Sequence, residues 1–285
     1  MAEKKEFKEK IVAFVDILGF KGLVEAAESG TGKALPEILE LLEELGRSKE
    51  IESIRMRGSS ICPQSRCLEG DLEIQMTQIS DCVIVSSEPS PLGALNVIFH
   101  CNKVVMALMR HGFMCRGYII QGKVHHTSTQ VVGSGYQKAY AKESQVSAFK
   151  TEADERGTPF VEVDAVVADL INLSEDSCVK KMYARMVKSD GDLVVIYPFQ
   201  NVGHSFIINH KYSADKERSE VQKVREGLVW LKHNLKKYVD PNNVSATKKV
   251  NHYLRALDEQ LECCSQVEKT IDALAKPIGA GLVRR

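Results

Sequence analysis

Two aspartates stand where predicted strands end, and carboxylates in such positions can hold a divalent cation. The first, Asp16, directly follows five apolar residues, 11–15, which predict a buried β-strand. Gly19 and a predicted helix that begins near Phe20 come next, so that backbone N–H groups at the start of the helix could bind phosphate oxygens beside the cation. An aspartate here can also simply cap the helix, and this segment alone leaves both interpretations open.

The second aspartate, Asp81, lies at the tip of a predicted β-hairpin. Residues 72–79 alternate apolar and polar side chains, as a half-buried strand does, and the apolar run 82–85 continues after Asp81. If the first strand lies beside this hairpin, Asp16 and Asp81 meet at one edge of a sheet, where a divalent cation would relieve their repulsion. Two metal ions about 3.5–4 Å apart can activate an attacking oxygen and stabilise a leaving phosphate.

Three other segments carry weaker signals. Asp71 is the rival second ligand, but we favour Asp81 because an apolar strand follows it directly. Residues 30–33, Gly-Thr-Gly-Lys, resemble part of a phosphate-binding loop, but no strand leads into them and Ala34 stands where Ser or Thr is needed, so we predict a loop between helices. The pair at 125–126, two histidines, can supply further metal ligands or simply end a polar strand, and we favour the strand end.

The remaining pattern predicts an α/β (α+β) fold with a mixed sheet flanked by helices. Apolar spacing predicts a helical region over 20–46 and a helix over 91–111. We expect further strands at 116–122, 160–163 and 193–197, and a helix from 135 to about 148, while residues 56–70 have the composition of a surface loop.

The character of the chain changes after about residue 213. Apolar residues are then spaced three and four apart from Val221 to Tyr238, in the manner of a coiled coil, and Asp240-Pro-Asn-Asn243 interrupts the pattern before a second apolar stripe. Two helices joined by a short turn form a helical hairpin. We therefore predict a catalytic domain over 1–205 and a C-terminal helical extension over 206–285, packed either on the same chain or on a second copy.

Composition excludes some classes of function. Lysine plus arginine equals aspartate plus glutamate, 38 of each, which argues against a dedicated nucleic-acid-binding protein. The charged N-terminus has no apolar signal segment, and no run approaches the roughly 20 apolar residues that span a bilayer. The eight cysteines are scattered without zinc-site spacing. We expect a reduced, cytoplasmic protein that binds neither nucleic acid nor membrane.

Several short motifs resemble, in order, those of the class III nucleotide cyclases. The run Phe14-Val-Asp16-Ile-Leu-Gly19-Phe20 is similar to their Phe-x-Asp-Ile-x-Gly-Phe signature, and Ser80-Asp81 stands where they carry Gly-Asp at the tip of a metal-binding hairpin. Residues 116–122, Arg-Gly-Tyr-Ile-Ile-Gln-Gly, resemble their Arg-x-Gly-Ile-x-x-Gly strand, and 132–133, Val-Gly, their Trp-Gly turn. The resemblance covers residue 11 to about 148, around half of the chain.

The departures from the family pattern point to a subgroup. Where adenylate and guanylate cyclases carry Asn-x-x-x-Arg on the helix after the turn, this chain has Gln137 and Ala141, and Thr77 stands near the place of their purine-selecting residue. The pattern Val-Gly-Ser-Gly-Tyr-x-x-Ala-Tyr-x-x-Glu over 132–143 resembles the pyrimidine cyclases of bacterial Pycsar anti-phage systems. Those are stand-alone cyclase domains with a helical C-terminal addition.

The resemblance implies an activity and a set of metal ligands. A nucleoside triphosphate, UTP in the first place, would become a 3′,5′-cyclic monophosphate and pyrophosphate. Asp16, Asp81 and the backbone carbonyl of Ile17 would hold two ions, Mn²⁺ or Mg²⁺, in each site. The N–H groups from Leu18 through Gly19 to Phe20 would assist at the triphosphate.

The resemblance also implies a homodimer with composite sites between the protomers. Thr77 and Gln130, from opposite protomers, are the candidates for reading the base edge. Arg116, Lys138 and Lys142 are the candidates for charge at the triphosphate or the transition state.

The family leaves several functions open. The favoured one is a uridylate cyclase whose cyclic UMP is a second messenger in anti-phage defence, read by a separate cyclic-nucleotide-binding effector. The alternatives are a cytidylate cyclase, a purine cyclase with an unusual base pocket, and a catalytically inactive cyclase-like domain that binds nucleotide.

Overall fold

A mixed eight-stranded sheet forms the centre of the molecule. The computed structural model describes residues 5–46, 73–152, 154, 157–199, 213–237, 239 and 242–275. In this part of the chain the strand order is β2-β3-β1-β4-β6-β8-β7, with β5 paired to β4, and every pairing is antiparallel except that of β4 with β6. The strands are β1 (Lys8–Ile17), β2 (Gln75–Ile79), β3 (Cys82–Ser87), β4 (Cys115–His126), β5 (Val131–Val132), β6 (Val161–Val163), β7 (Val187–Asp190) and β8 (Leu193–Ile196).

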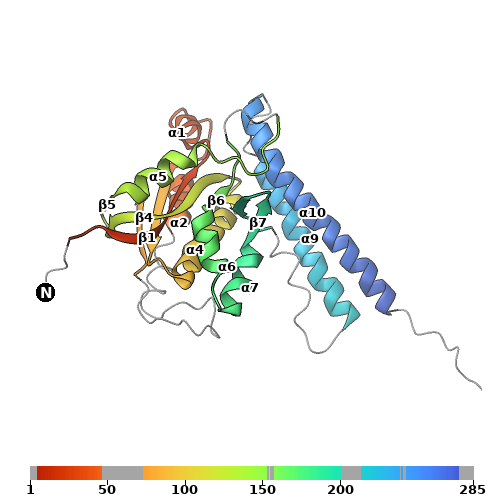
Figure 1. The fold of residues 1–285 in the computed structure, drawn as a ribbon. Helices are drawn as coiled ribbons and strands as arrows, with labels where there is room; N and C mark the ends of the chain where they lie inside the picture. The colour runs from red at the N-terminus through yellow and green to blue at the C-terminus, as the bar shows by residue number, and fades with distance from the viewer. Residues whose placement is uncertain are drawn as a thin grey trace, which may run out of the picture.

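Helices cover the sheet and continue beyond it (Figure 1). The described helices are α1 (Phe20–Glu28), α2 (Leu35–Gly46), α4 (Pro91–Arg110), α5 (Ser134–Glu143), α6 (Ala165–Asn172), α7 (Ser177–Met186), α9 (Ala214–Lys237) and α10 (Val244–Ala275). The expected α/β sheet flanked by helices, with a C-terminal helical hairpin, is confirmed.

Alternation along β1 sends its side chains to two different cores. Ile11, Ala13, Val15 and Ile17 point into the large core that α4 closes. The even-numbered side chains in between face the other side, where Val12 and Phe14 pack with Ile84, Val124 and Ala139 under α5. Because successive strand residues point to opposite faces, Asp16 belongs to this smaller face, beside α5.

Helix α4 is the buried centre of the large core. Pro91 stands in its first turn, and the Ser90 hydroxyl accepts a hydrogen bond of 3.0 Å from the Gly93 N–H, which satisfies one of the free amides at the helix start. Among the described residues α4 is the one helix with the length and apolar composition of a membrane span. The fold itself buries 83% of that apolar stretch, as expected for a core helix.

Helix α5 packs on β4 through two glycines. A Cβ atom on Gly122 would lie 2.8 Å from the Cα atom of Gly135, which is closer than real Cβ contacts come. The bare backbones therefore let the start of α5 lie against β4. This close approach is the structural reason for Gly122 at the end of the 116–122 motif and for Gly135 within the 132–143 pattern.

The C-terminal helices α9 and α10 form a long antiparallel pair that runs past the sheet edge carrying β7 (Figure 1). Leu228, Leu231 and Leu235 of α9 are buried, and Arg225 of α9 forms an ion pair of 2.6 Å with Glu268 of α10. Helix α9 also packs on α4, so the extension joins the main core of its own chain. The predicted domain boundary at 205/206 lies outside the described residues.

Some expectations need correction. The helix predicted to reach 148 ends at Glu143, and the sequence pattern did not reveal α6, α7 or β7. Cys178 is disulfide-bonded, which departs from the reduced chain that the scattered cysteines predicted. The predicted loop 56–70 lies outside the described residues.

Candidate active site

Asp16 and Asp81 lie together at one end of the sheet. Asp16 pairs with Cys82 of β3 on one side and with Arg116 of β4 on the other. Asp81 stands in the turn between β2 and β3, and its carbonyl accepts a hydrogen bond of 3.1 Å from the Ile17 N–H. This hydrogen bond ties the hairpin tip to the end of β1, so the structure brings together the two carboxylates that the sequence analysis singled out.

Burial and neighbouring carboxylates both oppose ionisation of Asp16. Burial raises its pKa most, the Asp81 and Glu143 carboxylates raise it further, and Arg116 lowers it, with a net pKa of about 7. The Asp16 and Asp81 side chains also lie within hydrogen-bonding reach of each other. At neutral pH the protein alone therefore holds Asp16 near half-ionisation, and a bound cation would favour the fully charged pair.

The two carboxylates suit a magnesium or manganese ion that is completed by a substrate. Among the described residues, no three or more histidine, cysteine, aspartate or glutamate side chains gather in a way that could hold a metal ion. A hard divalent cation such as Mg²⁺, however, commonly takes one or two carboxylates and receives its other oxygen ligands from substrate phosphates. The donor set of Asp16, Asp81 and a backbone carbonyl fits that manner of binding.

The Cys82 thiol beside the carboxylates is not a competing ligand. Burial raises its pKa, Asp16 and Asp81 raise it further, and the result is about 11. The thiol thus remains protonated at neutral pH, and a protonated thiol is a poor nucleophile and a poor metal ligand.

Arg116 is present at the site but already has an acidic partner. Its Nε atom lies 2.5 Å from Oε1 of Glu143 at the end of α5, and both side chains are largely buried. Arg116 also lowers the pKa of Asp16, so it lies close enough to act on the carboxylate pair. The predicted catalytic cation is therefore compensated in the free protein.

Glu143 is the residue at this site that sequence reasoning did not assign. It is the last residue of the 132–143 pattern, and the resemblance implied no role for it. Glu143 is buried on the inner face of α5, where a glutamate needs a cationic partner, and Arg116 on the neighbouring strand is that partner. This burial appears only when α5 packs on β4, so no local sequence pattern revealed it.

The start of α1 offers fewer phosphate-binding amides than expected. Gly19 precedes the helix with a φ of 81°, a left-handed conformation that glycine adopts without strain. The Leu18 N–H, however, donates a hydrogen bond of 2.9 Å to the Met114 carbonyl. Leu18 is thus removed from the expected set, and the amides of Gly19 and Phe20 remain as candidates.

The two predicted base-reading residues, Thr77 and Gln130, lie on the same face of the sheet and are linked to each other through Thr127 of the same chain. The Thr77 hydroxyl donates a hydrogen bond of 2.9 Å to the Thr127 carbonyl and lies 3.1 Å from Nε2 of His126. The Thr127 N–H donates to the Gln130 carbonyl at 2.8 Å. Since Nδ1 of His126 also bonds Ser86 at 2.7 Å, this ring serves as a polar strand end, as expected for 125–126.

Lys138 and Lys142 lie on the outer side of α5. Both side chains are exposed, and the Lys142 ammonium stands 5.4 Å from the ring centroid of Tyr118. The residue of α5 that raises the pKa of Asp16 is Glu143, not either lysine. A role for the two lysines at a triphosphate stays a prediction.

Comparison with known proteins gives only distant likenesses. No family model and no curated protein matches the chain. Among solved structures, two of a bacterial light-regulated adenylyl cyclase resemble 59% of this chain and 47% of their own, at 16% and 15% identity and TM-scores of 0.37 and 0.38. The catalytic core of a rhodopsin-guanylyl cyclase with converted specificity, in complex with ATPαS, matches 58% of this chain and 81% of its own, at 11% identity and a TM-score of 0.38. This chain spans about half the length of the first of them, and likenesses this distant assign no activity.

Proposed function

We propose that this chain is a metal-dependent nucleotide cyclase that converts a pyrimidine nucleoside triphosphate, UTP in the first place, to its 3′,5′-cyclic monophosphate. The observation that carries the proposal is the meeting of Asp16 and Asp81 at the end of β1, secured by the hydrogen bond from Ile17 to the hairpin tip. The two carboxylates belong to motifs that follow one another along β1, the β2–β3 hairpin, β4 and the start of α5.

The reaction is an internal displacement at phosphorus. The ribose 3′-oxygen forms a bond to the α-phosphorus, the bond from that phosphorus to the bridging oxygen of the β-phosphate breaks, and pyrophosphate leaves while the hydroxyl proton passes to solvent. Two Mn²⁺ or Mg²⁺ ions, when bound, would lower the pKa of the 3′-hydroxyl and neutralise charge on the triphosphate. Asp16, Asp81 and the Ile17 carbonyl are the oxygens that would hold them.

The chain's other residues would orient the triphosphate. The N–H groups of Gly19 and Phe20 lie at the positive end of α1, where phosphate oxygens are favoured. Arg116 would face the developing charge if the substrate drew it from Glu143, since a doubly charged phosphate competes well for a guanidinium.

The proposal includes a homodimer with a site at each interface. Its support is apolar surface beside the smaller core, where Tyr140 of α5 is 59% exposed and Ile79 of β2 is 50% exposed. Thr77 and Gln130 remain the proposed base readers, and Lys138 and Lys142 the proposed phosphate contacts. The 1–205 unit would carry the catalytic site and 206–285 the helical extension, in a cytoplasmic protein whose product a separate effector reads in anti-phage defence.

The test is to incubate the purified protein with each of the four ribonucleoside triphosphates and Mn²⁺ and to identify the products by mass spectrometry. We expect cyclic UMP and pyrophosphate, and loss of both in Asp16→Ala and Asp81→Ala. Cyclic CMP would make the protein a cytidylate cyclase, and a cyclic purine nucleotide would refute the pyrimidine assignment while preserving the chemistry. Asp192→Asn, an exposed aspartate in the β7–β8 turn, is the matched control.

A second candidate is a cyclase-like domain that binds nucleotide without turnover. The observation that favours it is the Arg116–Glu143 ion pair, which neutralises the one arginine that acts on Asp16, together with Ala141 in place of an arginine on α5. This candidate predicts that Mn²⁺ and a nucleoside triphosphate bind, without release of pyrophosphate from any of the four.

A further inference from the structure

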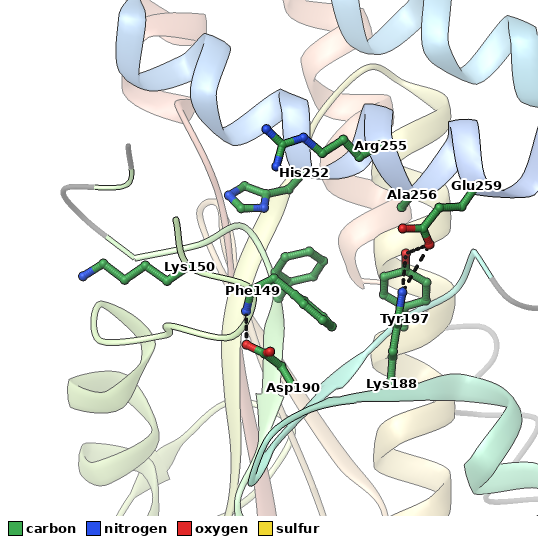
Figure 2. Close-up of a pocket in the computed structure, with 10 residues that line it drawn as sticks. Phe149, Lys150, Lys188, Asp190, Tyr197, His252, Arg255, Ala256 and Glu259 are labelled. Carbon is green, nitrogen blue, oxygen red and sulfur yellow. Dashed lines mark hydrogen bonds and ion pairs between the residues drawn. The ribbon is translucent and has the colours of Figure 1, made fainter. Parts of the chain in front are cut away.

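A polar pocket lies at the β7–β8 side of the sheet, at the seam between the α/β body and the helical extension (Figure 2). It encloses about 280 Å³. Its walls come from the loop after α5, from β7, from the end of β8 and from the inner side of α10. None of the residues proposed for nucleotide cyclisation lines it.

The acidic groups in this pocket are already engaged. The Asp190 carboxylate accepts a hydrogen bond of 2.5 Å from the Phe149 N–H. Glu259 of α10 accepts hydrogen bonds from Lys188 at 3.2 Å and from the Tyr197 hydroxyl at 3.3 Å. Lys188 thus compensates the charge of Glu259, whereas the printed partner of Asp190 is a neutral N–H group.

Two cationic side chains of the pocket have no such compensation. Lys150, from the loop after α5, and Arg255, from α10, make no side-chain hydrogen bond or ion pair with the residues that the structure describes. In Figure 2 both lie at the His252 end, away from the Lys188–Glu259 contact at the other end. With Lys188 paired to Glu259, Lys150 and Arg255 outweigh the remaining Asp190 and leave the pocket lining with one surplus positive charge.

A neighbouring hollow of about 40 Å³ extends the positive surface. It shares Arg255 and His252 with the larger pocket and adds Lys248 and Asn251 of α10 together with Thr151. Arg255 thus stands between the two hollows, and its planar guanidinium carries five donors in the fork geometry that suits phosphate oxygens.

The wall below these cations is held in a strained conformation. Phe149 has a φ of 59°, in the left-handed region that phenylalanine rarely adopts, and the Asp190 carboxylate fixes its N–H. Nearby, Asp154 accepts hydrogen bonds from Thr151 and contacts the His252 ring at 3.0 Å, which joins the loop to α10. Strained residues that their surroundings fix in this way cluster at ligand sites.

We propose that this pocket binds a small organic phosphate monoester, with its phosphate between Arg255 and Lys150. A phosphate monoester carries a charge of about −1.5 to −2 at neutral pH and three strong acceptor oxygens, so that both cations can contact it. The volume exceeds what a bare phosphate fills, since one water takes about 30 Å³ of liquid. The remaining space is bordered by Phe149, Phe160 and Ala256, which suits an organic group.

The test is calorimetric titration of the full chain with three probes: inorganic phosphate, ribose 5-phosphate and uridine 5′-monophosphate. EDTA is present throughout, so that no divalent ion loads the Asp16–Asp81 site. We expect saturable binding of at least one organic phosphate, and the preferred probe distinguishes a nucleotide from a sugar phosphate. Arg255→Gln should weaken it by about tenfold to a hundredfold and Lys150→Gln by about tenfold, since each removes a charge-assisted contact.

Two control variants make the outcome decisive. Lys269→Gln removes an exposed charge from the same helix, about 21 Å further along at 1.5 Å per residue, and should leave the affinity unchanged. Asp16→Asn should also leave it unchanged, so a failure of the cyclase proposal does not affect this one. Equal affinities in Arg255→Gln and Lys269→Gln, loss of binding in Asp16→Asn, or no saturation at millimolar probe would each overturn the proposal.

Discussion

The half-buried Asp16 and the buried Asp154 stand in opposite electrostatic surroundings. Asp16 is placed beside Asp81, and burial with this neighbour raises its pKa to about 7. Burial would also raise the pKa of Asp154, but hydrogen bonds from Thr151 and the His252 ring lower it below its ordinary value. The fold thus stabilises the charge of Asp154 from within and leaves Asp16 short of positive charge.

This difference in charge compensation distinguishes a structural joint, that is, a contact that only holds two segments of the chain together, from a site that can bind a ligand. Asp154 and His252 are 98 residues apart, and their contact connects the loop after α5 to α10. A joint of this kind gains from full compensation, because an unpaired buried charge costs several kcal/mol. The Asp16–Asp81 pair is costly as it stands, and a cation from outside the chain is what would make it favourable. Such an uncompensated pair is therefore evidence for a ligand.

The largest effect is expected when Asp16 gains a positively charged partner from within the protein. In Glu143→Gln, Arg116 loses this carboxylate partner, and its positive charge then acts more strongly on Asp16. We expect the affinity for Mn²⁺ to fall by about tenfold to a hundredfold, in the range that neighbours of metal ligands cause. Titration of Mn²⁺ by electron paramagnetic resonance measures this without any turnover. An unchanged affinity would mean that Glu143 does not set the charge of the site.

A smaller effect should appear in the pH dependence of stability. Since the folded pKa of Asp16 lies above its unfolded value of 3.8, the folded protein binds more protons between about pH 4 and 7, and the metal-free protein loses stability as the pH rises through that window. Asp16→Asn has no such loss. It should be more stable than the parent by about 2 kcal/mol at pH 8, after discounting for partial exposure, and about equal to it at pH 4.

Urea unfolding in EDTA at the two pH values measures this difference, with Asp192→Asn as the control. Saturating Mn²⁺ should then reverse the order at pH 8, because only the parent retains both carboxylates for the cation. A variant that is less stable than the metal-free parent at pH 8 would contradict the raised pKa.

The sequence singled out Asp16 and Asp81 because the strand end and the hairpin tip that carry them follow local rules, whereas their meeting depends on the pairing of β1 with β3. Strand alternation and the hairpin turn fix where the two carboxylates lie once β1 pairs with β3. The Arg116–Glu143 pair was not predicted, since it joins residues 27 apart whose side chains meet only when α5 packs on β4. The glycine contact that permits this packing, between Gly122 and Gly135, is equally invisible in a linear pattern.

The far side of the sheet was the least predictable part. The strands expected at 160–163 and 193–197 are present as β6 and β8, but β7 has four residues, too few for a period to be recognised, and α6 and α7 have only eight and ten. The seam pocket depends on how α10 lies against this region, which no local propensity determines. The sequence therefore predicted the central strands and hairpin, while the joint at Asp154 and the pocket beside it required three-dimensional placement.

The smallest expected effect concerns Asp154, the compensated aspartate of the comparison. Because the folded pKa of Asp154 is lowered, its charge stabilises the fold above its unfolded pKa of 3.8, and this contribution is lost as the pH falls through the folded pKa. Asp154→Asn should therefore cost about 1 kcal/mol at pH 7, the value of one hydrogen bond, and progressively less towards pH 3. Urea unfolding at both pH values, again with Asp192→Asn as the control, measures the change. Asp16→Asn thus stabilises the protein at high pH, whereas Asp154→Asn destabilises it there. Two curves of the same sign would show that the two aspartates do not differ in the way the structure describes.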